Sequence, residues 1–223
     1  MQAAELTRPL PLEAPGGRTV AEQRLRDAIA DGEMAPGHRL VEADLVAQLG
    51  VSRSHVRLAI DALAAEGLVE RIPNRGARVR VVSVEEAVAT TECRMALEAL
   101  IARKAAERVT PREIGQLRAH LGRMHAAVDA GDVVGYSALI QQLHGALHAA
   151  GRQPVATRLV DRLQAQLVRH QFRLSLRPGR SRVSLAELTA LVDAVADRDG
   201  DRAEAASVAH FRSVIAALRE DRS

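Results

Sequence analysis

Arg53 and Arg57 stand four residues apart, directly after the stretch Gly50-Val51-Ser52, and their type and spacing suit the recognition of DNA bases. Ser52 can accept a backbone N–H and so cap a helix that begins at Arg53. A guanidinium group near the start of a helix in a major groove donates two hydrogen bonds to O6 and N7 of guanine. We therefore predict that Arg53 and Arg57 read base edges.

Neighbouring residues suit contacts with the DNA backbone. Ser52 and Ser54, together with the first-turn N–H groups, fit phosphate oxygens, and His55 lies at the same end of the helix. Arg75 and Gly76 fall at the tip of a predicted hairpin, where glycine permits close approach to a minor groove. The alternative is that the two arginines only solvate an exposed helix face, because arginines at i and i+4 are common on surface helices.

Hydrophobic periodicity and turn residues predict the elements that hold these groups. Across 53–66 four apolar residues share one face, so this helix docks on one side and is free on the other. A short helix and a turn precede it and two alternating strands follow it, which is the order of a winged helix-turn-helix. The shared face carries Val56, Ala59, Ile60 and Leu63, and the predicted elements are helices over 20–32, 42–49 and 53–66, an extended step at 40–41, and hairpin strands over 68–72 and 77–81.

Strand signals stop after Ser83, and helical periodicity continues to the end of the chain. Residues 1–17 contain three prolines and no sustained apolar period, so we expect a mobile tail. The fold class is therefore mainly α, with a winged helix-turn-helix domain over 18–82 and an all-helical domain over 83–223. The six helices predicted in the second domain cover 84–108, 111–130, 132–150, 153–176, 184–197 and 200–220.

Composition argues against several classes of function. The chain has 223 residues, enough for two small domains, and aromatic residues make up 1%, too few for stacking on single-stranded nucleic acid. No apolar run approaches the roughly 18 residues of a membrane-spanning helix, and the N-terminus lacks a signal-peptide layout. We expect a cytoplasmic protein without a membrane partner.

Enzymatic chemistry finds little support in the sequence. No nucleophile elbow, phosphate-binding loop or intact metal set is present, so we expect a protein that is not an enzyme. The single cysteine, Cys93, cannot form an internal disulfide, and it falls in an apolar helical pattern where a buried thiol is expected.

The segment 22–79 resembles the winged helix-turn-helix of the GntR family of bacterial transcription regulators. It departs from the family at Leu58, where glutamate is usual, and at Ala43, where some members carry an arginine. The resemblance implies a regulator, most simply a repressor, that binds double-stranded DNA as a homodimer on an inverted repeat. The motifs that carry it are Pro36-Gly37-x-x-Leu40, Leu49-Gly50-Val51-Ser52-Arg53, Val56-Arg57, Leu63-x-x-Glu66-Gly67-Leu68-Val69 and Arg75-Gly76.

The rest of the chain resembles the helical FCD domain of the FadR-like branch of that family. The number of predicted helices, six, and the sequence motif at residues 41–45 suggest the VanR-like subgroup. The resemblance implies a small-molecule effector, for example a carboxylate, whose binding modulates operator affinity. The alternative is a dimeric DNA-binding regulator that has lost metal and ligand sensing. The motifs are Arg94-Met95-Ala96-Leu97-Glu98, Leu143-His144-Gly145-Ala146-Leu147 and Asp199-Gly200-Asp201-Arg202-Ala203, followed by His210.

Many FCD domains hold a divalent metal on four ligands, and the matching positions here are Ile140, His144, Leu188 and His210. Two apolar side chains remove donors that such a site needs, so we expect no cofactor and no tightly bound metal at this position. Three uses remain open for the two histidines. They line an effector pocket with Arg94 as its cation, they are core histidines with internal hydrogen bonds, or they belong to a rebuilt metal site that uses His148, one turn beyond His144.

Overall fold

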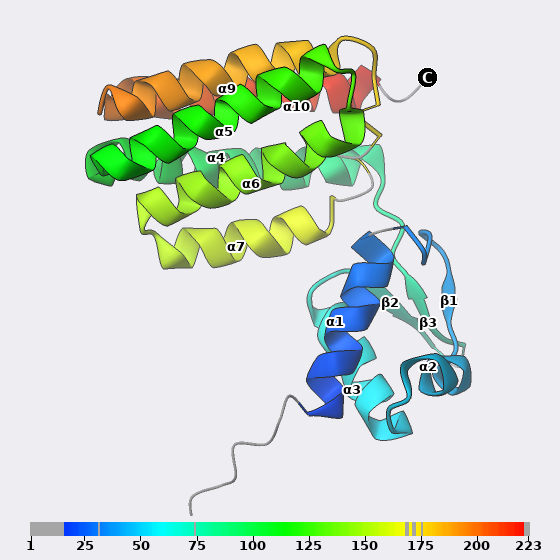
Figure 1. Cartoon of the computed structure of the whole chain (residues 1–223). Coiled ribbons are helices and arrows are strands. Elements are labelled where there is room, and N and C mark those ends of the chain that lie inside the picture. The colour runs from blue at the N-terminus through cyan, green and yellow to red at the C-terminus, as the bar shows by residue number, and fades with distance from the viewer. Residues whose placement is uncertain are drawn as a thin grey trace, which may run out of the picture. The chain divides into compact units, whose positions relative to one another are not determined.

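The structure, a computed structural model, describes residues 16–30, 32–73, 75–167, 170, 173–174 and 176–220. The chain divides into two compact units, and the division falls between Val81 and Val82 (Figure 1). Of the predicted tail, residues 1–15 lie outside the described residues, and Gly17 already begins a helix.

The first unit contains three helices and a small sheet, which confirms the predicted winged helix-turn-helix. Of the predicted extended step at 40–41, Leu40 belongs to a third strand, whereas Val41 is the N-cap of the following helix. The sheet therefore has three antiparallel strands in the order β1-β3-β2 rather than a hairpin alone. Backbone bonds from Gly37 N to Val79 O and from Val79 N to His38 O, both 2.9 Å, continue that pairing. The elements are α1 (Gly17–Ala30), β1 (Arg39–Leu40), α2 (Glu42–Leu49), α3 (Arg53–Ala65), β2 (Val69–Ile72) and β3 (Gly76–Val79).

The turn between α2 and α3 is set by two residues. Gly50 ends α2 in the left-handed conformation, with φ of 64°, where glycine avoids the strain of a side chain. Ser52 then begins α3, because its side-chain oxygen accepts a hydrogen bond from the backbone N–H of His55. The buried face of α3 is the predicted one, and it consists of Val56, Ala59, Ile60 and Leu63.

The regular secondary structure in the described residues of the second unit is all helical, and it confirms the predicted fold class. Helix α4 is central, since α10 packs along it and α6, α7 and α9 also contact it. Its start is capped by Ser83, and α5 begins with a capping box between Thr110 and Glu113. The described helices are α4 (Val84–Arg108), α5 (Pro111–Asp129), α6 (Val133–Gly151), α7 (Pro154–Ala165), α9 (Arg180–Ala196) and α10 (Gly200–Glu220) (Figure 1).

Two expectations for this unit are wrong. The helix predicted over 153–176 ends at Ala165, and a turn follows at 166–167, although no glycine or proline marks the break. Cys93 is exposed rather than buried, because it lies beside the exposed Glu92 on the outward face of α4. Within the described residues, no helix has the length and apolar character needed to cross a bilayer.

Close packing of α6 on α4 predicts opposite effects of alanine at two glycines of α6. A methyl group at Gly151 would lie 2.9 Å from the carbonyl oxygen of Ile101, whereas one at Gly145 would meet nothing within 4 Å. We expect Gly151→Ala to lower the free energy of unfolding by about 1–3 kcal/mol through overpacking. Gly145→Ala should raise it by about 0.5–1 kcal/mol, because alanine favours a helix interior. Urea denaturation of both variants measures this, and equal effects would contradict the close approach.

Candidate functional sites

The exposed end of α3 carries the residues predicted to contact DNA. Ser52, Arg53, Ser54 and Arg57 are all exposed, while the opposite face of the helix is buried in the first unit. Among the described residues Arg53 has no hydrogen bond or ion pair. The structure thus places two guanidinium groups at one solvent-facing helix end, which is the geometry that major-groove reading needs.

Arg57 is paired with Glu42 from the preceding helix. Its Nη2 lies 3.1 Å from Oε2 and its Nε lies 3.2 Å from Oε1 of that carboxylate. The hydrogen bond from Arg57 holds the pKa of Glu42 below its ordinary value, against the opposing effect of burial. The ionic partner of Arg57 therefore comes from α2 rather than from the next residue of α3, which is the exposed Leu58.

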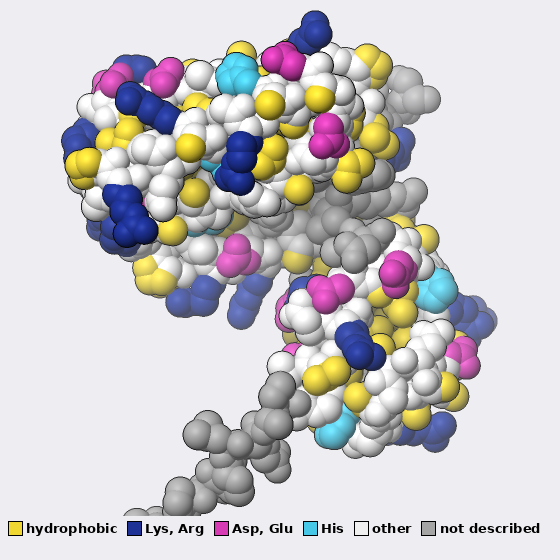
Figure 2. All heavy atoms as spheres, viewed as in Figure 1, with side chains coloured by type: hydrophobic (Ala, Val, Ile, Leu, Met, Phe, Trp, Pro, Cys, Tyr) yellow, Lys and Arg dark blue, Asp and Glu magenta, His cyan; other side chains and the backbone are white. Residues whose placement is uncertain are grey.

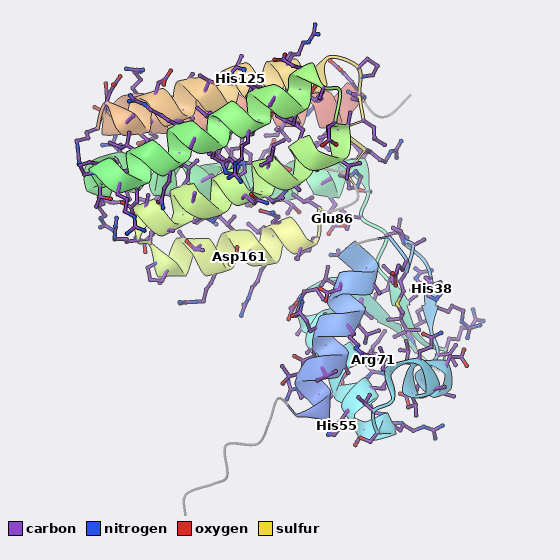
Figure 3. All side chains as sticks on the ribbon, viewed as in Figure 1. His38, His55, Arg71, Glu86, His125 and Asp161 are labelled. Carbon is purple, nitrogen blue, oxygen red and sulfur yellow. The ribbon has the colours of Figure 1, made fainter. Side chains whose placement is uncertain are left out.

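The remaining residues at this end of α3 are engaged within the protein. The Ser52 hydroxyl accepts from the backbone N–H of His55 at 3.3 Å and shares a 2.8 Å hydrogen bond with Ser54. The His55 ring lies against the start of α1 (Figure 3), where a methyl group on Gly17 would come within 2.5 Å of its Nδ1. His55 is therefore less available to a ligand than the two arginines.

The wing tip presents Arg75 and Gly76, as predicted from the hairpin. Arg75 is exposed, and its backbone N–H donates to the carbonyl of Ile72 at 3.0 Å to close the turn. Gly76 has φ of +85°, a left-handed conformation that strains any residue with a side chain. The tip therefore combines the solvent-exposed side chain of Arg75 with a glycine backbone that a ligand can approach closely.

The second unit contains a cavity between α4, α6, α9 and α10. The cavity volume that the centres of water molecules can occupy is about 80 Å³, which is enough for several waters or a small polar ligand. The three residues predicted for effector binding, Arg94, His144 and His210, all line it, and so does Ile140. The other lining residues are Tyr136, Ser137, Gln141, Leu174, Arg180, Ser181, Ser184, Phe211 and Val214.

One wall of the cavity is built on a buried carboxylate that the sequence analysis did not single out. Glu98 and Arg94 are each 4% exposed, and the Arg94 Nε and Nη2 donate to Oε1 of Glu98 at 3.1 and 3.0 Å. The other carboxylate oxygen of Glu98, Oε2, is 2.9 Å from His148 Nε2 and 3.8 Å from His144 Nδ1. The i, i+4 spacing of Arg94 and Glu98 on α4 signals their pairing, but the two histidines reach this carboxylate from another helix.

Protonation in this cluster follows from burial and neighbouring charge. Burial opposes ionisation of Glu98, yet His144, the hydrogen bond with His148 and the Arg94 cation together hold the pKa of Glu98 well below its usual range. Burial lowers the pKa of His144, although Glu98 opposes that shift. The buried Nδ1 of His144 makes no hydrogen bond with the described residues.

His210, in a second wall of the cavity, is held by Glu187 of α9, another residue that sequence reasoning missed. Its Nδ1 is 2.8 Å from Oε2 of Glu187, and Arg180 Nη2 is 3.4 Å from the same oxygen. Burial raises the pKa of Glu187, but hydrogen bonds with His210 and Ser213 and the nearby charges outweigh it, so the pKa lies below its ordinary value. Glu187 is thus an anion that interacts with the Nδ1 atom of His210.

The four positions at which the family resemblance implies a metal do not fit one. Ile140 lines the cavity without a donor atom, and Leu188 is fully buried in the hydrophobic core of this unit. Only His144 and His210 offer nitrogen, and the Nδ1 of His210 already interacts with Glu187. The residues present at this position therefore cannot assemble the implied ligand set.

Tyr136 is a further cavity residue that the sequence did not reveal. Its ring is almost fully buried, and its hydroxyl makes no hydrogen bond with the described residues. Burial raises the pKa of Tyr136 against the opposing effect of the neighbouring Ser184 side chain, so the hydroxyl stays protonated and can donate. A polar ligand would give this group the partner that it lacks.

Comparison with known proteins gives matches in both units. A family model described as bacterial regulatory proteins, gntR family, matches residues 18–79, and a model of the FCD domain matches residues 89–213. The HTH-type transcriptional repressor RspR of Escherichia coli (strain K12) is 27% identical over 198 residues, which cover 89% of this chain and 87% of RspR.

Two further proteins show the same similarity over most of the chain. An uncharacterized HTH-type transcriptional regulator in an unstable DNA locus of Streptomyces ambofaciens is 31% identical over 193 residues, 86% of this chain and 80% of that protein. The solved structure of E. coli McbR/YncC superimposes with a TM-score of 0.79 at 20% identity, covering 93% of this chain and 99% of that chain. The latter likeness shows a common fold.

The Glu187 pair predicts a component of acid sensitivity. Because the pKa of Glu187 is lower in the folded chain than its ordinary value of 4.5, the unfolded chain takes up this proton first as the pH falls. Stability from this group is present above about pH 4.5 and is lost below it. We expect Glu187→Gln to lower the free energy of unfolding at neutral pH by about 1–3 kcal/mol and to flatten its decline below about pH 4.5. Urea denaturation across that range measures both, and an unchanged slope would contradict the assignment.

Proposed function

This chain belongs to the gntR family of bacterial regulatory proteins and carries an FCD domain, and from that premise we propose that it is a sequence-specific DNA-binding repressor whose operator affinity is set by a small effector. Members of this family are transcriptional regulators and not enzymes. The observation that carries the proposal is the solvent-facing end of α3, with Arg53 and Arg57 on it.

Reading of bases is assigned to Arg53 and Arg57. Arg53 is already free to enter a groove, whereas Arg57 must exchange its carboxylate partner, Glu42, for a guanine edge. An exposed ion pair contributes little because water and salt compete with it, and two hydrogen bonds to a guanine in a groove contribute more. The exchange therefore favours the DNA complex.

Contacts to the DNA backbone are assigned to the residues around these arginines. Ser52 and Ser54, with the first-turn N–H groups of α3, suit one phosphate, and Arg75 with Gly76 suits the adjacent minor groove. His55 belongs to the same surface, but its packing against α1 gives it the smallest share.

We propose a homodimer on an inverted repeat of double-stranded DNA, acting in the cytoplasm. A single recognition helix makes too few base contacts for useful selectivity, and a two-fold protein reads a two-fold site. Hydrophobic side chains reach the surface of the helical unit (Figure 2). Val155 and Leu159, which are one turn apart on α7, are both exposed. A second copy that covers such residues would stabilise the dimer.

The effector is proposed to be a small carboxylate in the cavity of the helical unit. Arg94 and the unpartnered hydroxyl of Tyr136 can donate to it, and the small volume favours a compact molecule. Binding would couple to the DNA-bound arrangement by about 1–3 kcal/mol, the usual range for coupled sites.

A second candidate is a dimeric regulator that no longer senses a ligand. One observation favours it: the cations that face the cavity already have anionic partners, since Arg94 contacts Glu98 and Arg180 contacts Glu187. Operator affinity that no small acid changes would select this candidate.

Membership of the FadR-like branch and its VanR-like subgroup is also a proposal. Helix number does not support it, because His170, Arg173 and Leu174 are helical between α7 and α9, in addition to the six long helices. The sequence motif Val41-Glu42-Ala43-Asp44-Leu45 at the start of α2 supports the assignment to this subgroup.

Arg57→Ala tests the reading helix, with Arg26→Ala as the matched control. Both arginines pair with a glutamate in the same unit, but Arg26 joins α1 to Glu66 at 2.8 and 2.9 Å, away from the exposed end of α3. Duplexes selected from a random pool supply the operator, and fluorescence anisotropy measures affinity. We expect Arg57→Ala to weaken operator binding about 5- to 150-fold and to relax one base position, and Arg26→Ala to leave selectivity intact. Equal operator affinity and equal base selectivity in the two variants would show that α3 does not recognise the bases.

Filling the cavity tests the effector proposal. Thermal unfolding with acetate, succinate or benzoate should show a higher midpoint for one of them, because a ligand of the folded state stabilises it. Ile140→Phe places a ring in the cavity and should abolish the shift, whereas Ala138→Phe, on the exposed side of the same helix, should retain it. A shift that survives Ile140→Phe places the ligand elsewhere.

A further inference from the structure

We propose that Glu98, His144 and His148 form a binding site for Zn²⁺ or a similar borderline divalent ion, at a place different from the metal position of related domains. The three residues are buried, and one donor atom of each lies within 4.8 Å of the other two. The site goes beyond the proposed function, because it needs neither DNA nor an effector.

Helix geometry brings the three donors together. His144 and His148 are four residues apart on α6, so both imidazoles lie on one face of that helix, and Glu98 faces them from α4. Donors in a tetrahedral zinc site are about 3.3 Å apart, given bonds of about 2.0–2.2 Å. The observed separations from Glu98 Oε2, 2.9 Å to His148 Nε2 and 3.8 Å to His144 Nδ1, lie on either side of that value.

The state of each donor also fits a cation. The Nδ1 of His144 is buried and makes no hydrogen bond with the described residues, so a metal would supply a missing partner. Oε2 of Glu98 has His148 as its hydrogen-bond partner at 2.9 Å. A metal ion takes the place of the hydrogen shared by Glu98 and His148, and that proton moves to the other ring nitrogen or to solvent.

Arg94 shapes the site rather than blocking it. Its guanidinium binds Oε1 of Glu98, which fixes the carboxylate and leaves Oε2 directed at the histidines. Such a partner behind a metal ligand orients that ligand. Arg94 also balances the charge of Glu98, so the bound ion would carry uncompensated positive charge. A water or an anion from the adjoining cavity, which His144 and Arg94 line, would therefore complete the coordination.

The donor set restricts the metal. Two imidazoles and one carboxylate suit Zn²⁺, Ni²⁺ and Co²⁺, whereas Mg²⁺ and Ca²⁺ prefer oxygen ligands throughout. The metal position of related domains would share His144 with this site but would need His210 in place of Glu98 and His148. Single substitutions can therefore distinguish the two metal positions: loss of His148 affects only the site proposed here, and loss of His210 affects only the position of related domains.

The experiment is a metal titration of the untagged full chain after removal of metals with a chelator. Isothermal calorimetry with ZnCl₂ should give one ion per chain, and CoCl₂ should give visible absorption of tetrahedral intensity. His148→Gln should weaken zinc binding at least about 100-fold, because it removes a ligand outright. His210→Gln is the matched control and should keep an affinity close to wild type. MgCl₂ should not compete.

Three results would overturn the proposal: no zinc binding by the wild-type chain, unchanged affinity in His148→Gln, or loss of affinity in His210→Gln, which would put the ion at the position used by related domains. Circular dichroism checks that each variant is folded. If His148→Gln does not fold, anomalous scattering at the zinc edge from wild-type crystals decides instead. An ion bonded to Glu98, His144 and His148 supports the site, and an ion anywhere else refutes it.

Discussion

The helical unit depends on one buried charge, the carboxylate of Glu98 on its central helix. A buried ion is stable only when paired and hydrogen-bonded, and Arg94 and His148 meet that need from two helices. These contacts fix α6 against α4 and set the positions of Arg94 and His144 at the cavity wall. The wall of the cavity that α4 and α6 form is therefore a consequence of how this carboxylate is satisfied.

The winged unit follows a different rule, because its functional groups are on the outside. Its core holds one face of α3 firmly, and this leaves the opposite face free to carry charge into a groove. Rigid support behind the exposed arginines limits the conformational freedom that the helix loses on binding. The pair between Arg57 and Glu42 adds to this support, since it joins the two helices of the motif across their turn.

Local signals in the sequence predict much of this architecture. Gly50 and Ser52 mark the turn before α3, and alternation marks the wing strands, because breakers, caps and periodicity act over a few residues. The same signals miss the end of α7, where no breaker stands, and the exposure of Cys93, which depends on which helices happen to cover α4. They also miss Glu98 and Glu187 as site residues, because each meets its histidine across a separation in sequence that only tertiary packing closes.

The short strand β1 gives the wing a mechanical property. Because β1 pairs with β3, and Gly37 and His38 extend that pairing, the segment between α1 and α2 is fastened to the wing at residues 37–40. The hairpin cannot swing as an independent flap, and a force applied at its tip is transmitted to the helices. Strain imposed by bent DNA would then be felt throughout the unit instead of being absorbed by a hinge.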